Sequence, residues 1–485
     1  MGKRLIIILA LVLVASFTCA AYAEVQNVKV SGDITAYGII RNQFGFMKAG
    51  ARTNSSVGGT GTDSANPKNE AALASVVRVR VDADLTDNVS ATVRLLNERY
   101  WGGENNTITV GRSFGTGETN SNNTTINLDL AYVTLREFLY SPLTMTVGRQ
   151  ELHFGNDMIV GAVNTNMLTN ATSGFYGGDE DLSARKSFDA LRATLDYNPL
   201  VVDMLFAKIT EDKINDNDDQ NLMGVNAKYD FGRKNTTLEG YYWANYRGRK
   251  TNVGPFNGQS KADVVNVVGG LLKSMPIENL SASLEFAYQF GQLYDTTNLK
   301  KVSRKAFAAE AGLNYRMPKM KYTPSFTVLG AWFTGAKSPT YAGSSVGTST
   351  MDHPYTGWDP MFENQKYGDI VNSLLPQSNV RLVGGMASMK PMDDITLQGE
   401  YYAYWWDRKF PNGLATLSSG STRGYAYRMN NKRFAGQEID LKATYDYTED
   451  VQISLLGGVL LPGNSFDETN RAPASEVIGS MKVTF

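Results

Sequence analysis

Cysteine and histidine, the side chains that most often carry metal or nucleophilic chemistry, are nearly absent from this sequence. Its 485 residues include one cysteine, Cys19, and two histidines, His153 and His353. A single cysteine excludes an internal disulfide, a thiolate metal site and a Cys-x-x-Cys-His haem attachment. A hydrolase needs a nucleophile beside a base, and no nucleophile motif or metal-ligand spacing accompanies either histidine. We therefore expect no enzymatic activity, no metal and no cofactor.

Long apolar runs are also missing, apart from one at the N-terminus. Leu5–Ala15 is shorter than the roughly 20 residues that a membrane-spanning helix needs. Two basic residues precede this run and the small-x-small site Ala21–Ala23 follows it, which is the pattern of a secretory signal peptide. Lipid modification of Cys19 is the alternative, but the Phe-Thr pair before it does not resemble that processing site. We predict that residues 1–23 are removed and that the mature chain begins at Glu24.

Neither sign of charge dominates. The chain has 47 basic and 48 acidic residues, and removal of the signal leaves 45 basic residues against 48 acidic ones, a net charge of −3. This balance gives no reason to expect nucleic-acid binding. Glycine (46) and tyrosine (25) are plentiful instead. In an exported chain, that composition is typical of an outer-membrane β-barrel.

The clearest local pattern is a β-hairpin from Ser75 to Trp101. Apolar and polar residues alternate in both arms, and Leu85–Asn88 forms the turn. One face carries Val77, Val79, Val81, Ala83, Leu85, Val89, Ala91, Val93 and Leu95; the other carries Arg78, Arg80, Asp82, Asp84, Ser90, Thr92 and Arg94. Period-2 alternation indicates that the two faces have different surroundings. A soluble sandwich alternates in the same way, so the hairpin alone leaves the choice open.

The spacing of such segments along the chain decides the architecture. Eighteen segments alternate: 28–41, 71–85, 88–101, 125–138, 143–155, 187–197, 200–210, 221–231, 236–247, 262–274, 279–291, 304–316, 321–334, 379–390, 395–408, 433–447, 451–461 and 475–485. Short turns and longer polar links alternate strictly between them. The short turns are 85–88, 140–142, 198–199, 232–235, 275–279, 317–321, 391–394 and 448–450; the longer links are 42–70, 102–124, 156–186, 211–220, 248–261, 292–303, 335–378, 409–432 and 462–474. This order predicts an up-and-down barrel with both termini on the periplasmic side.

Aromatic residues gather at the segment ends in two groups. Tyr140, Tyr197, Tyr229, Phe231, Tyr315, Tyr322, Tyr445 and Tyr447 lie beside short turns, and Tyr100, Trp101, Tyr246, Phe290, Trp332, Trp405 and Trp406 lie near long links. Two levels of rings are typical of the two interfaces of a membrane, so the valines of the hairpin are expected to face lipid. The chain ends at Phe485. A terminal phenylalanine on an amphipathic strand resembles the signal that the barrel assembly machinery recognises.

Three stretches resemble the alginate-export family of outer-membrane barrels. They are VGRQELHFGNDMIVG (147–161), SFDALRATLDY (187–197) and GQEIDLKATYDYTEDVQISLLGGVLLPG (436–463). The resemblance implies an 18-stranded barrel and passive passage of an anionic polysaccharide or smaller solutes. It also implies that Arg149 and Asp189 belong to a charged constriction. Because Arg149 shares the parity of Val147, which should face lipid, we expect a bulge at Gly148 to turn it inward.

The inward faces of the predicted strands carry many charges of both signs. The basic residues are Arg78, Arg80, Arg94, Arg136, Arg192, Arg247, Arg316, Arg381, Lys228 and Lys442; the acidic ones are Asp82, Glu98, Asp196, Asp230, Glu239, Glu285, Glu310, Glu400, Glu438 and Asp440. Cationic rings in a water-filled lumen concentrate anions, which favours an anionic substrate. Pairing of each arginine with an acid across strands is the structural alternative. We expect Glu438, Asp440 and these basic residues to line the pore.

Two links invite separate hypotheses. The longest, 335–378, contains His353 and several aromatic residues, and we expect it to be an inward-folded gate or a surface lid. Deletion of Thr340–Asn372 should then raise the conductance. The acidic link 211–220 alternates Asp and Asn as calcium loops do, but it lacks their glycine and final glutamate, so we interpret it as a solvated loop. A barrel that sheaths an electron carrier is a further alternative, whose haem would come from another chain.

Together these features predict an all-β chain, with residues 24–485 forming a single transmembrane antiparallel barrel of about 18 strands in a Gram-negative outer membrane. We expect a porin for hydrophilic, anionic saccharides such as alginate-like polyuronates. The alternative is a general or anion-preferring porin for small solutes. The expected partners are outer-membrane lipid, the solute, the barrel assembly machinery and periplasmic export partners.

Overall fold

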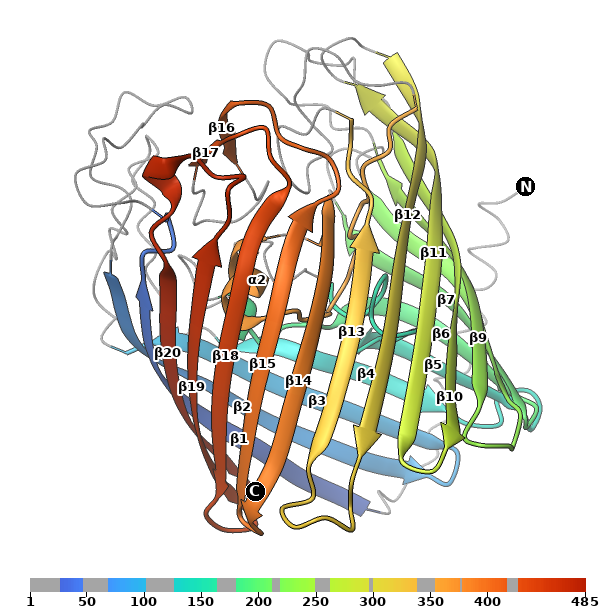
Figure 1. Ribbon diagram of the computed structural model, residues 1–485. Helices are drawn as coiled ribbons and strands as arrows, with labels where there is room; N and C mark the ends of the chain where they lie inside the picture. The colour runs from blue at the N-terminus through green and yellow to red at the C-terminus, as the bar shows by residue number, and fades with distance from the viewer. Residues whose placement is uncertain are drawn as a thin grey trace.

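The alternating segments form the strands of one closed sheet in the computed structural model (Figure 1). The structure describes residues 27–46, 69–101, 126–163, 180–211, 219–248, 262–295, 300–337, 354–375, 377–416 and 426–485. Each wall strand pairs antiparallel with the wall strands before and after it, and pairing of the first strand with the last closes the ring of eighteen. The predicted fold class, number of strands and strand order are confirmed.

The wall strands follow the predicted ranges closely. They are β1 (Asn27–Asn42), β2 (Asn69–Thr86), β3 (Val89–Tyr100), β4 (Asn127–Leu135), β5 (Leu143–Gln150), β6 (Phe188–Asp196), β7 (Leu200–Thr210), β8 (Gln220–Asp230), β9 (Thr237–Arg247), β10 (Asp263–Ile277), β11 (Leu280–Asp295), β12 (Lys300–Arg316), β13 (Ser325–Phe333), β14 (Val380–Met392), β15 (Ile395–Trp406), β18 (Phe434–Asp446), β19 (Val451–Pro462) and β20 (Ala474–Thr484). Short turns join them at one end of the barrel, here called the short-turn end. The other end carries the longer links and is called the long-loop end.

Little regular structure lies outside the wall. It comprises a two-stranded sheet of β16 (Gly413–Thr416) and β17 (Ala426–Met429), the short helix α2 (Asp369–Leu374), and the 3-10 helices η1 (Glu180–Leu182) and η3 (Glu468–Asn470). Within the described ranges, no helix has the length and apolar character needed to cross a membrane. Because β16 pairs antiparallel with β17, the predicted link 409–432 contains a small two-stranded sheet of its own.

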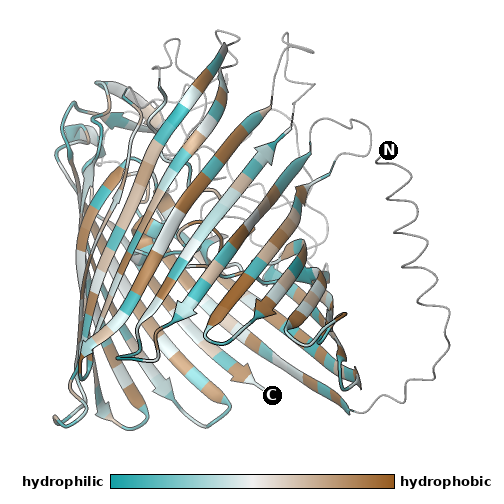
Figure 2. Ribbon diagram, turned by 90° about the vertical axis from the view of Figure 1, so that its right-hand side faces the viewer, coloured by the Kyte–Doolittle hydropathy of each residue, from teal (hydrophilic) through white to brown (hydrophobic). Residues whose placement is uncertain are grey.

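The hairpin of β2 and β3 shows how the alternation becomes a two-faced wall. Val81 pairs with Val93 and Arg80 pairs with Arg94, so valines share one face and arginines the other. Val93 and Leu95 are exposed on the outer surface, whereas Arg94 is buried. Figure 2 shows apolar and polar residues alternating along the strands. Exposed apolar side chains extend over the whole outer face, which water would disfavour and lipid accommodates.

Aromatic rings mark both ends of this outer face. At the short-turn end, the rings of Tyr229 and Phe231 lie 5.0 Å apart between centroids. At the long-loop end, the rings of Phe307 and Trp332 lie 4.7 Å apart. The two predicted levels of aromatic residues are therefore present, at the positions where amphipathic rings meet lipid headgroups. Trp406 is an exception, because it is fully buried against Phe410 and Phe466 in the inner core.

The C-terminus completes the seam between β20 and β1. The Gly32 amide donates a hydrogen bond to the Phe485 carbonyl oxygen (2.8 Å), and the Phe485 amide donates to the Gly32 carbonyl oxygen (3.0 Å). A side chain at Gly32 would lie 2.7 Å from the Phe485 ring, so glycine leaves room for that ring. The C-terminus lies at the short-turn end (Figure 1).

Two of the longer links enter the barrel instead of covering it. The predicted strand 143–155 ends at Gln150, because the chain turns into the lumen at Glu151. Residues 151–163 and 354–375 pack inside the ring of strands, with α2 in the second segment (Figure 1). We call these two segments the lumen insert. Residues 354–375 of the longest link thus fold inward and do not form a surface lid, and their role as a gate stays a prediction; residues 338–353, including His353, lie outside the described residues.

Candidate functional site

The two segments of the lumen insert are joined to each other through their backbones. The Phe362 amide donates to the Ile159 carbonyl oxygen (3.1 Å), and the Gly161 amide donates to the Phe362 carbonyl oxygen (2.8 Å). The Asn364 amide donates to the Asp157 carbonyl oxygen (3.0 Å). Segments that are about two hundred residues apart in the chain therefore occupy the lumen as one unit.

Apolar contacts fix this unit to the inner wall. Phe154 packs against Trp243 on β9, with ring centroids 4.7 Å apart, and Phe362 packs edge-on against Phe188 on β6 at 5.7 Å. Ile370 of α2 is fully buried in the same apolar cluster. The lumen therefore contains a packed hydrophobic core around the insert, and the wall residues in contact with this core are apolar.

Carboxylates of the inner wall bind the backbone amides of the insert. Glu438 on β18 accepts hydrogen bonds from the amides of Ile370 (2.7 Å) and Val371 (2.9 Å), which belong to the first turn of α2. Glu239 accepts from the Gly155 amide at 2.7 Å, and Glu285 accepts from the Asn156 amide at 3.0 Å. Bonds from an amide to a carboxylate are stronger than those between neutral groups. These acids therefore hold the insert.

An ion pair ties the centre of the insert to the wall. Asp359 accepts two hydrogen bonds from Arg247 at the end of β9, at 2.6 and 3.0 Å. A second guanidinium group, that of Arg304 on β12, has a nitrogen 3.6 Å from the Asp359 carboxylate. Burial by itself raises the pKa of the Asp359 carboxyl, but the two arginines outweigh burial and hold this pKa well below its usual range. Asp359 therefore stays ionised.

A second acid of the insert has the opposite electrostatic environment. Glu363 is almost fully buried, and its carboxylate accepts a hydrogen bond from the Gln365 amide at 3.0 Å. Burial raises the pKa of Glu363 to about 7, against the opposing effects of that amide and of Lys186. Burial also lowers the pKa of Lys186. Glu363 is thus a carboxyl of the insert that can change its charge near neutral pH.

Several predicted pore arginines are already paired with acids on the inner face. The pairs are Arg78 with Asp33, Arg80 with Asp82, Arg94 with Asp129 and Glu151, Arg192 with Asp203, and Arg247 with Asp359. Arg192 also lies over the Phe154 ring, 5.3 Å from its centroid. For these arginines the structure therefore supports the alternative of local neutralisation.

The inward orientation expected for Arg149 and Asp189 is wrong. The ladders of β5 with β4 and β6 continue through Gly148 without a register shift, so the expected bulge is absent. Arg149 and Asp189 face each other on the side of Val147 and Leu191, which are exposed to the outside. Their ion pair measures 3.1 Å. The pair therefore belongs to the outer face of the barrel.

The inward orientation expected for Arg381 is also wrong. Val380 and Leu382 point inward and are buried against the insert, so Arg381 between them points outward. It lies over the ring of outward-facing Trp332 at 4.2 Å. Strand parity was misassigned here because the insert makes the lumen apolar at this level. The usual rule of polar residues inside and apolar residues outside is reversed for these residues.

The acids Glu438 and Asp440 face inward as predicted, but they are buried beneath α2 and have 0% and 2% exposure. Asp440 accepts a hydrogen bond from the Asp369 amide at 3.3 Å. Their charges therefore act on the insert and are hidden from solutes in the open part of the lumen.

Basic and acidic residues both occur on the inner wall near the short turns, the acids including Asp196 and Asp230. Lys228, Lys273, Arg316, Lys442 and Lys482 are exposed or half-buried there. Each has the parity of buried inward residues, as Lys442 has with Glu438 and Asp440. None of the five forms an ion pair with another described residue. We call these five residues the basic vestibule; Lys273 and Lys482 were not predicted as pore residues.

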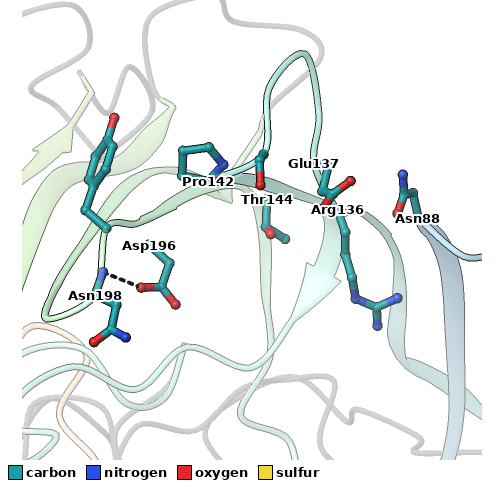
Figure 3. A pocket seen from close by; sticks show the side chains of 9 residues that line it. Asn88, Arg136, Glu137, Pro142, Thr144, Asp196 and Asn198 are labelled. Atoms are coloured by element: carbon teal, nitrogen blue, oxygen red, sulfur yellow. Dashed lines mark hydrogen bonds between the residues drawn. The ribbon is translucent and has the colours of Figure 1, made fainter.

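A cavity of about 660 Å³ adjoins the inner rim at the short-turn end. Arg136, Glu137, Thr144 and Asp196 are among its lining residues (Figure 3). Asp196 accepts a hydrogen bond from the backbone amide of Asn198 (3.0 Å) and so shapes the turn. The exposed Arg136 brings a guanidinium to this polar rim.

A family model described as alginate export matches residues 56–480 of this chain. The chain belongs to the alginate export family. No curated protein sequence matches the chain.

Solved barrels from Pseudomonas aeruginosa resemble this member of the alginate export family. The outer membrane protein opdK has a TM-score of 0.53 and 9% identity, with 95% of this chain and 100% of that chain covered. OpdL has a TM-score of 0.52 and 11% identity, with coverage of 95% and 99%. OccK2 (OpdF) in complex with glucuronate has a TM-score of 0.51 and 9% identity, again with coverage of 95% and 99%. At such identities the likeness shows the fold alone.

Family and fold together identify an outer-membrane channel in a Gram-negative bacterium. This confirms the predicted family and barrel architecture. His353 lies outside the described residues. The ring of His153 hydrogen bonds with Asp157 (2.9 Å), and this bond raises the pKa of His153. Among the described residues, no cluster of three metal-ligating side chains occurs.

Sequence reasoning placed Glu239, Glu285, Glu438 and Arg247 on the inner wall, but it gave no role to Asp359 and Arg304. It also missed Arg41, which lies outside the insert and pairs with Asp181 (2.7 Å) and Glu476 (3.1 Å). These partners are far apart in sequence, so no local pattern reveals them. The one usable signal was an acid among the aromatic residues of the longest link, because such an acid needs a basic partner when it is buried.

Proposed function

We propose that this alginate export family member is a passive channel for anionic hydrophilic solutes, with uronate saccharides as the substrate class. The observation that carries the proposal is the basic vestibule, in which five cationic side chains of the inner wall have no acidic partner among the described residues. Unpaired cations around a water-filled passage raise the local concentration of anions and steer them inward.

Several acids of the inner wall accept hydrogen bonds from backbone amides instead of forming ion pairs with the basic vestibule. Glu239, Glu285 and Glu438 bind amides of the insert. At the short-turn end, Asp196 and Asp230 accept hydrogen bonds from turn amides, Asp230 from Gly232 at 2.8 Å. No ion pair joins these acids to the basic vestibule within the described residues, so its five cationic side chains remain available to bind anions, which supports anion preference.

The substrate class and the orientation rest on separate arguments. OccK2, a barrel of similar fold, was solved with glucuronate, and a uronate carries the carboxylate that lysines and arginines bind. We propose that the short-turn end, with both termini, faces the periplasm. Phe485 at the seam is then available to the barrel assembly machinery, and the polar rim around Arg136 to periplasmic export partners.

A general porin for small anions is the second candidate. The lumen insert favours it, because a packed unit held by Asp359, Glu438 and apolar contacts leaves less room for a polymer than an empty barrel would. We further propose that the chain has no enzymatic activity, since the acids and histidine described above have structural partners. A sheath for an electron carrier has no support in the described residues.

Current through single channels in planar bilayers distinguishes these candidates. We expect oligouronates to interrupt the chloride current in a concentration-dependent way, while neutral oligosaccharides of equal length interrupt it far less. Interruption by monomeric uronates but not by longer ones would favour the small-solute porin. Equal effects of neutral and anionic sugars would contradict the proposed substrate class.

A further inference from the structure

Asp407, directly after β15 at the long-loop end, is surrounded by donors. It accepts a hydrogen bond from Arg381 Nε (2.8 Å) and one from the Trp332 indole N–H (2.9 Å). The Gly335 amide donates to its other oxygen at 2.9 Å. With 5% of its side chain exposed, this carboxylate is a buried centre whose hydrogen-bonding capacity is largely filled.

Two more guanidinium groups lie around the same acid. Arg408 Nε lies 3.8 Å from the Asp407 carboxylate, and half of the Arg408 side chain is exposed. Arg433 is exposed and donates to the carbonyl oxygens of Asp407 (2.5 Å) and Trp406 (3.4 Å). We call Arg381, Arg408 and Arg433 the arginine cluster. Within the described ranges no other carboxylate pairs with it, so three positive charges meet one negative charge.

Arg381 lies on the outer face at the aromatic level, and Arg408 and Arg433 adjoin it through Asp407. Arg381 lies over the outward-facing Trp332 ring, 4.2 Å from its centroid, and 45% of its side chain is exposed. The rings of Trp405 and Phe434 pack beside it, 5.8 Å apart. Strands β14, β15 and β18, whose ends carry the cluster, are adjacent in the wall (Figure 1). Rings at this level mark the depth of lipid headgroups.

We infer that the arginine cluster binds the phosphate of a lipid headgroup, specifically that of the phosphorylated glycolipid of the outer leaflet. Planar guanidinium groups bind phosphate oxygens with paired hydrogen bonds, and basic sites at the interface select anionic headgroups. The choice of leaflet rests on the proposed orientation, in which the long-loop end faces the cell exterior. Arg149, by contrast, is matched one to one by Asp189 on the same outer face and should not bind phosphate.

Native mass spectrometry of the full-length barrel in detergent tests the ligand class. The probes are bisphosphorylated lipid A, the same lipid without phosphates, phosphatidylglycerol and inorganic phosphate. We expect retention of bisphosphorylated lipid A at least tenfold stronger than that of the dephosphorylated lipid or phosphatidylglycerol. We also expect no displacement by millimolar phosphate. Equal retention with and without phosphates overturns the inference, as does full displacement by inorganic phosphate. Tighter retention of phosphatidylglycerol overturns the choice of leaflet.

Variants locate the site. R408Q/R433Q should weaken retention of lipid A at least tenfold, R408K/R433K should keep most of it, and R149Q should leave it unchanged. Heat-modifiable migration in gels checks that each variant forms a barrel. Unchanged retention by a folded R408Q/R433Q barrel overturns the site. This test is independent of the channel proposal. Ion selectivity depends on the lumen, so R408Q/R433Q should have the same ion selectivity as the wild type.

Discussion

Asp359 of the lumen insert and Arg247 of the wall form a two-bond ion pair, with oxygen-to-nitrogen distances of 2.6 and 3.0 Å. The carboxylate is buried, and Arg304 adds a second positive charge beside it. Because Asp359 belongs to the insert and Arg247 to the wall, the pair fixes the position of the insert relative to the wall. We therefore expect the width of the passage to depend on it.

Replacement of Asp359 by asparagine should loosen the insert. D359N leaves Arg247 and Arg304 without their counter-charge, and removal of one partner of a buried pair costs about 3–5 kcal/mol. We expect a higher mean single-channel conductance and more frequent changes between conductance levels. Recordings in planar bilayers measure both quantities.

A matched control is D82N, which breaks the partly exposed Arg80–Asp82 pair on the wall. Such a pair contributes about 0–1 kcal/mol, so we expect D82N to gate like the wild type. If folded D359N channels also behave like the wild type, Asp359 does not fix the position of the insert. The larger deletion of Thr340–Asn372 should exceed D359N in conductance.

The buried Glu363 should make the insert sensitive to pH. Burial raises its pKa from 4.5 to about 7, so between these values the packed insert holds a proton that an opened insert releases. The stabilising effect is complete below pH 4.5 and is lost as pH rises through about 7. We therefore expect openings to be more frequent at pH 8 than at pH 5.

The variant E363Q isolates this contribution. It stays neutral at both pH values, so the difference in opening frequency between pH 5 and pH 8 should be clearly smaller than in the wild type. Lys186, whose pKa is lowered by the same burial, remains present in both proteins. An identical pH dependence in E363Q and wild type would assign the effect to other groups.

The backbone of the Gly-Arg-Gln motif requires glycine at position 148. Its φ is +122°, and a Cβ there would lie 2.2 Å from the Ala131 carbonyl oxygen. A non-glycine residue in such a conformation costs about 1–3 kcal/mol, so G148A should lower the free energy of unfolding by at least that amount. G240A is the control, since a Cβ at Gly240 meets no atom within 4 Å. Equal unfolding midpoints in urea for both variants would contradict this reading of the motif.

The wall could be predicted because lipid imposes its pattern residue by residue. Leu441 on β18 and Leu455 on the neighbouring strand β19 face lipid at exposures of 64% and 56%, so an alternating sequence reveals both strands. The end of β5 could not be predicted in the same way. The residues after Gln150 continue to mix polar and apolar types, and only the apolar core inside the lumen explains why the chain leaves the wall there.

The site was only partly predictable for the same reason. Lys228, Arg316 and Lys442 follow the simple rule of polar residues inside, and they face the lumen as expected. Arg381 does not, because its neighbours Val380 and Leu382 pack on the insert. Nor does any local pattern link Asp359 to Arg247, which is 112 positions away. The rule fails wherever the lumen itself is apolar.

We propose that the basic vestibule makes the channel select anions. The most direct test is the reversal potential in a potassium chloride gradient, for the wild type and for K228Q/K273Q/R316Q/K442Q, with R149Q on the outer face as control. We expect anion selectivity in the wild type and in R149Q, and its loss in the fourfold variant. Cation selectivity of the wild type, or an unchanged reversal potential in the folded fourfold variant, would contradict the account.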